Sequence, residues 1–183
     1  MILVHGGLNN PGALTSEKLC IPHRKLLLCF MLKLNFPDFS FRFKNSENKP
    51  LIFDVIRKKF VVLTPEEWVR QHVVQFLISE KQFPISHINV EKQLLLNETK
   101  KRYDIVVFNK DGSIHLIVEC KAPNIGINQD TFDQIARYNL VTEATYLMVT
   151  NGLSHYFCQM DYEQERYEFL KALPKNDASV KNS

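Results

Sequence analysis

Two apolar runs joined by a tight turn constrain the fold more than any other feature of this sequence. The first extends from Tyr103 to Asn109 and the second from Ile114 to Ala122. Both contain many Ile and Val residues, which favour strands, and Asp111-Gly112 between them is a strong β-hairpin signal. We therefore expect an antiparallel pair of strands whose side chains alternate between two faces.

Segments on either side of this pair predict a mixed sheet with helices packed on it. Thr64 followed by Pro65 and two glutamates is a strong helix start, and this helix should end near Lys81. A second helix is expected over 130–143. Strands are expected over 51–62, interrupted by a basic patch, and over 88–96, 145–149 and 155–160. The expected class is α/β, with an α+β-like central mixed β-sheet flanked by helices.

The ends of the chain differ from its middle. Residues 1–30 hold three of the six glycines and show little periodicity, whereas strand-like alternation begins at Met31. We expect 1–30 to be an N-terminal extension that is flexible or not native. Residues 31–174 should form one domain, and 175–183 a disordered tail.

Composition excludes several classes of protein. The chain is 45% hydrophobic and 23% charged, so it can build a core and is not of the disordered class. No apolar run reaches the roughly 18 residues of a membrane span, so no membrane partner is expected. The four cysteines show no zinc-ligand spacing, which favours a reduced, cytoplasmic protein. Residues 31–174 carry 18 basic and 18 acidic residues, so any DNA binding must come from a local site.

Charged residues stand out at the ends of the two central strands. Asp104 lies in the first strand, and Glu119 and Lys121 end the second. Glu-x-Lys occurs three times in the chain and is no signal by itself, but only this copy ends an apolar run. If Asp111-Gly112 is the whole loop, Asp104 faces Glu119. A four-residue loop over 109–112 would place Asp104 opposite Ile117, with the two acids diagonal.

Facing carboxylates repel each other unless a cation lies between them. Magnesium suits two carboxylates plus a phosphate. Lys121 shares a strand face with Glu119 and could orient or deprotonate water, or stabilise charge on the phosphate. The pattern predicts metal-assisted hydrolysis of a phosphodiester. The alternative is that Asp104 ends a strand at the surface and that Glu119 and Lys121 form an exposed edge pair.

Longer motifs resemble a known family. The runs 102–107 and 117–122 resemble the core of PD-(D/E)xK nucleases. Residues 64–71, 119–123 and 132–139 resemble the N-terminal nuclease domain of type I restriction enzyme R proteins, in the family's order from about Met31 to Pro174. The resemblance implies a restriction-endonuclease-like fold, Asp104 and Glu119 as ligands of Mg²⁺, for which Mn²⁺ substitutes, and Lys121 as the catalytic lysine.

The resemblance also implies accessory residues. Gln134 and Tyr138 match a Gln-x-x-x-Tyr motif; four residues apart, they share a helix face and would contact DNA. In the alternative interpretation, Tyr138 is a core residue and Gln134 a cap or surface group. Glu67 is the candidate for an additional acid from the first helix, with Glu66 as competitor. Acids in a first turn also simply favour the helix dipole.

The implied function is that of a metal-dependent DNA endonuclease of a restriction system. Its implied partners are DNA and the helicase-like motor, methyltransferase and specificity subunits. The sequence holds no GxxxxGK[ST] phosphate loop, so ATP-driven translocation is not carried over. The competing hypotheses are a non-catalytic DNA-binding or assembly module that retains the fold, and a repair or junction nuclease.

Overall fold

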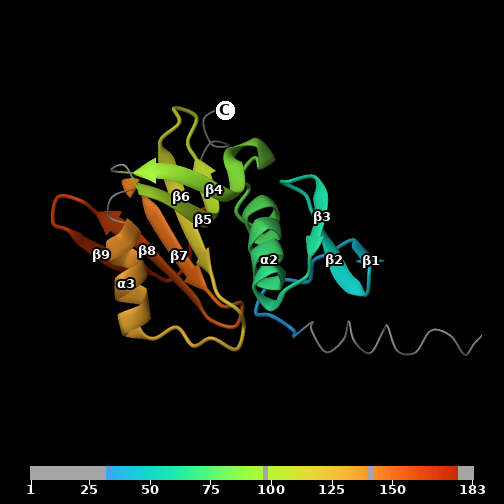
Figure 1. The fold of residues 1–183 in the computed structure, drawn as a ribbon. Coiled ribbons are helices and arrows are strands. Elements are labelled where there is room, and N and C mark those ends of the chain that lie inside the picture. Colours follow the sequence, from blue (N-terminus) through green and yellow to red (C-terminus); the bar gives the residue numbers. More distant parts are fainter. Residues whose placement is uncertain (1–31, 97–98, 140–141, 177–183) are drawn as a thin grey trace, which may run out of the picture.

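The computed structural model describes residues 32–96, 99–139 and 142–176. These residues form a six-stranded sheet, a three-stranded sheet and two α-helices (Figure 1). The predicted extension over 1–30 lies outside the described residues, as does the predicted tail from 177 onward. Neither of the described α-helices is long and apolar enough to cross a membrane.

The large sheet has the mixed topology that the sequence predicts. Its strands lie in the order β4-β5-β6-β7-β8-β9, and every neighbouring pair is antiparallel except β6 and β7, which are parallel. The strands are β4 (Ile88–Leu96), β5 (Thr99–Phe108), β6 (Ile114–Cys120), β7 (Tyr146–Thr150), β8 (His155–Asp161) and β9 (Arg166–Leu170). The last strand was not predicted, because its alternation of polar and aromatic residues follows a polar turn.

Helix α2 (Pro65–Ser79) begins where the sequence predicts. The Thr64 hydroxyl accepts a hydrogen bond of 3.0 Å from the Glu67 N–H and caps the helix. The helix packs against β5 and β6, and a short 3₁₀ turn, η1 (Ile85–His87), leads into β4. In Figure 1, α2 covers one face of the large sheet, between that sheet and the small one.

Helix α3 (Gln129–Asn139) covers the other face and contacts β7 (Figure 1). Phe132 and Ala136 are buried as predicted. The prediction that the helix reaches Glu143 is wrong, because Glu143 has a φ of 53° in the left-handed region. The Thr142 hydroxyl donates a hydrogen bond of 2.6 Å to the Asn139 carbonyl at this helix end.

The small sheet consists of β1 (Phe43–Ser46), β2 (Lys49–Asp54) and β3 (Lys59–Val62) in sequence order. The single interrupted strand expected over 51–62 is therefore two strands of a hairpin. Asp54 forms the turn between them, since its Oδ1 accepts hydrogen bonds of 2.8 Å from the N–H groups of Ile56 and Arg57.

The β5–β6 hairpin has the predicted register but not the predicted loop. Ile105 pairs with Val118, and Val107 with Leu116, as the two-residue loop requires. Next to the loop, however, Phe108 pairs with Ile114, so the register shifts by one residue. The turn over 109–113 is longer than predicted, and a bulge lies beside it. The two effects cancel, so the strands have the register that would place Asp104 opposite Glu119.

Two clusters of buried residues lie on the two faces of the large sheet. Ile105, Leu116, Val118 and Cys120 belong to the cluster on the α2 face. On the α3 face the cluster contains the following side chains of α3 and the strands: Tyr103, Val106, Ile117, Phe132, Ala136, Leu147 and Val149. Most of β7 is buried, as expected for a central strand.

Candidate active site

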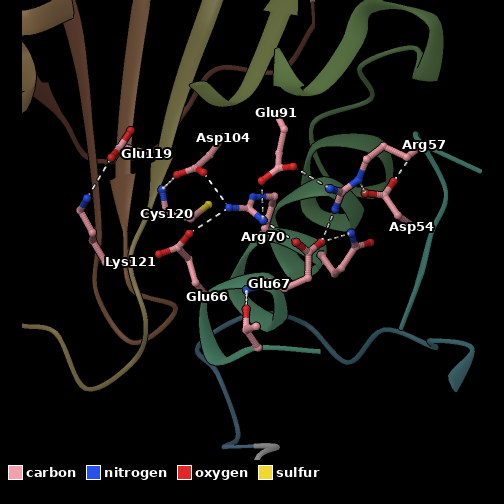
Figure 2. Close-up of polar contacts among 12 residues, drawn as sticks. Asp54, Arg57, Glu66, Glu67, Arg70, Glu91, Asp104, Glu119, Cys120 and Lys121 are labelled. Carbon is pink, nitrogen blue, oxygen red and sulfur yellow. Dashed lines mark hydrogen bonds and ion pairs between the residues drawn. The ribbon is translucent and has the colours of Figure 1, made fainter. Parts of the chain in front are cut away.

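The middle of β5 and the end of β6 bring the predicted catalytic residues close together. The Cys120 N–H donates a hydrogen bond of 2.7 Å to Asp104 Oδ2. Lys121, which follows β6, donates from Nζ to Glu119 Oε1 at 2.9 Å (Figure 2). Cys120 is buried on the α2 face and is a core residue, as predicted. Asp104, Glu119 and Lys121 are thus gathered where β5 and β6 meet.

Asp104 and Glu119 have different cationic partners. Asp104 Oδ1 accepts a hydrogen bond of 2.7 Å from Arg70 Nη2 of α2. In Figure 2, Arg70 lies on one side of Asp104, and Glu119 with Lys121 lies on the other. Within the described parts of the chain, no three His, Cys, Asp or Glu side chains are grouped as metal ligands. In this structure protein cations, Arg70 and Lys121, balance the two carboxylates.

The expected strand alternation fails at Asp104. Strict alternation would place Asp104 on the same face as Val106, but Val106 packs in the α3-face cluster whereas Asp104 pairs with α2. Glu91 of β4 lies opposite, between residues that pair with Tyr103 and Ile105, and has a φ of 51°. This left-handed residue indicates a local distortion of the ladder, which lets Asp104 turn toward Arg70.

An ion-pair network extends from Asp104 into the interior (Figure 2). Arg57 and Arg70 connect five carboxylates, those of Asp54, Glu66, Glu67, Glu91 and Asp104. Arg57 contacts Asp54 at 2.5 Å, Glu67 at 2.6 Å and Glu91 at 3.0 Å. Arg57 belongs to the basic patch that separates β2 from β3, and its side chain is only 17% exposed.

Arg70 joins this network to the candidate site. Besides Asp104, it contacts Glu66 at 3.0 Å and forms a short ion pair with Glu67. Burial lowers the pKa of Arg70, but the carboxylates of Asp104 and Glu67 raise it by more, so the net shift is upward. Arg70 is therefore a permanent cation held by acids on both sides.

The two glutamates at the start of α2 have different environments. The Glu67 side chain is 7% exposed and accepts hydrogen bonds from Arg57, Arg70 and Gln71. Glu66 is 47% exposed, shares Arg70 with Asp104, and contributes to raising the pKa of Lys121. Glu67 is therefore held inside the network, whereas Glu66 is the more accessible of the two acids.

Lys121 is positioned as a cation. Burial lowers its pKa, but the hydrogen bond to Glu119 and the nearby carboxylates of Asp104 and Glu66 raise it by more. The net pKa lies above the ordinary value, so the ammonium group is charged at neutral pH. Of the roles open to Lys121, stabilising negative charge fits this state better than deprotonating water.

The predicted DNA-contacting pair lies on α3. Gln134 is exposed on this helix. The backbone of Tyr138 is also helical, but its side chain lies outside the described residues. Their four-residue spacing within one helix agrees with a shared face, and their role in DNA contact stays a prediction.

Two residues of the site, Arg70 and Tyr103, were missed by sequence reasoning. The spacing of Arg70 from Glu66 and Glu67 is that of helical ion pairs and could have indicated those contacts. Nothing in the sequence indicated that Arg70 also contacts Asp104, which lies 34 residues further along the chain. Tyr103 is the second missed residue. Burial and the charge of Glu119 raise its pKa to about 12, which keeps a neutral phenol beside the site.

The described residues form a mixed α/β domain with a six-stranded central sheet. Residues 65–174 match the family described as the type I restriction enzyme R protein N terminus, and the chain belongs to this family.

A solved structure described as a fragment of an HsdR subunit of a type I restriction enzyme from Vibrio vulnificus YJ016 is similar, with 19% identity and a TM-score of 0.43. The match covers 63% of this chain and 24% of that one. Comparison with curated proteins gave no match.

Proposed function

We propose that this chain is a divalent-metal-dependent DNA endonuclease domain that hydrolyses phosphodiesters within a type I restriction system. The observation that carries the proposal is the gathering of Asp104, Glu119 and Lys121 where β5 and β6 meet, with Lys121 bonded to Glu119 at 2.9 Å. Membership of the R protein N-terminus family supports it. DNA and the motor, methyltransferase and specificity subunits of such a system are the proposed partners.

The donor set fits magnesium better than zinc. Asp104 and Glu119 offer carboxylate oxygens, and Mg²⁺ takes one or two protein carboxylates together with waters and substrate phosphate oxygens. The nearby Cys120 thiol is buried, and burial raises its pKa well above the ordinary value, so it is not a thiolate ligand. Asp104 and Glu119 would hold the ion, with Mn²⁺ as a substitute. When bound, the metal supplies Lewis-acid stabilisation of the phosphate and a more acidic water.

The remaining residues have separate roles in this proposal. The Lys121 ammonium stabilises negative charge on the phosphate oxygens. Arg70 orients Asp104 through its bond to Oδ1, while the Cys120 N–H holds Oδ2. Glu66, on the exposed side of Arg70, is the accessory acid. Gln134 and Tyr138 are proposed to contact the DNA beside the site.

Plasmid nicking in Mg²⁺ or Mn²⁺ tests the proposal. We expect the wild type to nick and Glu119→Gln to lose this activity while keeping its melting temperature. Glu168→Gln, which removes a 66% exposed carboxylate from β9, is the matched control and should nick like the wild type. Full activity of Glu119→Gln would show that the site is wrong.

A non-catalytic DNA-binding or assembly module is the second candidate. It is favoured by the engagement of both carboxylates with protein cations, Arg70 and Lys121. This candidate predicts metal-independent DNA binding without nicking under any condition. A preference for cleaving branched over linear duplexes would instead indicate a junction nuclease.

A further inference from the structure

A cavity of about 350 Å³ lies at the opposite end of the large sheet from Glu119 and Lys121. It is formed by residues that follow α2, by the β5–β6 hairpin, by the start of β7 and by the chain after β9. Figure 1 shows the hairpin at the same end of the molecule as the C-terminal end of α2 and η1. This volume is in the lower range of small-molecule pockets.

Aromatic rings line one part of this cavity. His115 has its ring centroid 5.3 Å from that of Phe83 and 5.1 Å from that of Tyr146. Phe108 also lines the cavity. His115, Tyr146 and Phe108 are all partly exposed, so they offer ring surface to a flat ligand.

Basic side chains line the rest of the cavity. His87, Lys110 and Lys175 contribute to the wall, and no carboxylate does so among the described residues. Asp111, on the same hairpin, is outside the wall, and its carboxylate accepts hydrogen bonds from the Ser113 N–H and hydroxyl. The cavity therefore carries an excess of positive charge.

The positive charge beside the cavity affects the pKa of a neighbouring lysine, Lys81. Burial and then the positive charge of Lys175 lower the pKa of Lys81, and Glu80 offsets them only in part. The Lys81 ammonium donates to the Leu173 carbonyl at 2.5 Å. The segment after Leu173 is fixed against the end of α2, since the Asn176 N–H donates to the Lys81 carbonyl at 2.9 Å. Lys175 is thus held beside the cavity by its neighbours in the chain.

We propose that this cavity binds a nucleotide unit, either a free mononucleotide or the 5′-terminal nucleotide of a DNA strand. The base packs against His115 and Tyr146, and the phosphate pairs with Lys110 and Lys175. Stacking on aromatic rings combined with cationic contacts to phosphate is the chemistry by which proteins bind unpaired nucleotides. The proposal does not depend on the metal site, which lies at the other end of β6.

Binding of mononucleotides without divalent metal tests the proposal. The full chain in EDTA is titrated with AMP and dTMP by calorimetry, and the contacts are mapped by the NMR signals of Tyr146 and His115. We expect saturable binding that the double variant Lys110→Gln/Lys175→Gln weakens at least about tenfold. The double variant Lys49→Gln/Lys59→Gln removes the same charge from exposed positions of the small sheet and should bind like the wild type.

Each outcome decides the proposal. Absence of saturable binding of both mononucleotides to the wild type would overturn it, as would equal weakening by the two double variants. Pyrophosphate that binds as tightly as AMP would refute the role of the base. A 5′-phosphorylated tetranucleotide distinguishes the sources: tighter binding than AMP, with the same mapped residues, assigns the cavity to strand ends, and weaker binding assigns it to free nucleotides. Since no metal is present, Glu119→Gln should bind AMP normally even if it cannot nick DNA.

Discussion

Arg70 Nη2 lies 2.7 Å from Asp104 Oδ1, and this ion pair joins α2 to β5 across 34 residues of sequence. The Arg70 side chain is 5% exposed and also contacts Glu66 and Glu67. One cation therefore neutralises the predicted metal ligand and holds the first turn of α2. Any divalent ion that binds Asp104 must share its carboxylate with Arg70 or displace the guanidinium.

Replacing Arg70 by Gln should weaken the fold and strengthen metal binding. The buried acids lose their partner, so unfolding in EDTA should become easier by roughly 3–5 kcal/mol, the usual cost of breaking a buried ion pair. Because Asp104 is released, added Mn²⁺ should raise the melting temperature of Arg70→Gln more than that of the wild type. Thermal unfolding with and without Mn²⁺ measures both effects.

Arg57→Gln is the control for this experiment. Arg57 belongs to the same network but contacts Asp54, Glu67 and Glu91 rather than Asp104. It should destabilise the protein without increasing the response to Mn²⁺. An equal Mn²⁺ response in the two variants would show that Arg70 does not compete with metal at Asp104.

Lys121→Arg should retain part of the nicking activity, whereas Lys121→Gln should lose roughly 10²–10³-fold. The raised pKa of Lys121 makes its ammonium a charge stabiliser, and arginine keeps that charge. Both variants should fold, since the side chain is 30% exposed. Rates from plasmid nicking at pH 7 to 9 test this; similar losses in both variants would mean that the lysine acts through more than its charge.

Local signals in the sequence predicted much of this fold. The cap and proline at the start of α2, the register of β5 and β6, and the inward face of α3 follow from neighbours close in the chain. These signals predicted the class of fold and the proximity of Asp104, Glu119 and Lys121.

Long-range contacts could not be predicted in the same way. The environments of Glu67 and Arg57 depend on their contact across the interior, and their spacing in sequence carries no periodic signal. The turn of Asp104 toward α2 depends on the distortion at Glu91 in a neighbouring strand. Such features arise from tertiary packing, which overrides the alternation expected of a strand.

Glu66→Gln and Glu67→Gln should affect different properties: Glu67→Gln mainly stability, and Glu66→Gln mainly nicking. Glu67 is buried among Arg57, Arg70 and Gln71, so Glu67→Gln should lower the free energy of unfolding by roughly 3–5 kcal/mol. Glu66 is half exposed, so Glu66→Gln should change stability by less than about 0.5 kcal/mol but reduce nicking. Chemical denaturation and nicking of both variants are the measurements. Unchanged nicking by Glu66→Gln would remove it as the accessory acid.

Two glycines with the same backbone conformation form a matched pair for stability. Gly152 has a φ of +84° and Gly112 a φ of +86°. A Cβ at Gly152 would lie 2.8 Å from Leu34 Cδ2, whereas nothing lies within 4 Å of one at Gly112. Gly152→Ala should therefore cost about 1–3 kcal/mol more than Gly112→Ala, because only it overpacks the core. Equal losses in urea denaturation would indicate that Leu34 moves aside freely.

Mild acid should destabilise the protein through His72. This side chain packs between aromatic rings, with centroids 4.1 Å from Trp68 and 4.7 Å from Phe41, and its Nδ1–H donates to the Trp68 carbonyl at 2.9 Å. Burial lowers the pKa of His72, so the unfolded chain binds this proton more readily than the folded one. Its contribution to stability is thus complete above the ordinary histidine pKa of about 6.5 and is lost progressively as the pH falls from there through the lower pKa of the folded state. Urea denaturation between pH 7.5 and 5 should show a smaller loss for His72→Gln than for the wild type; parallel losses would place the acid sensitivity in other residues.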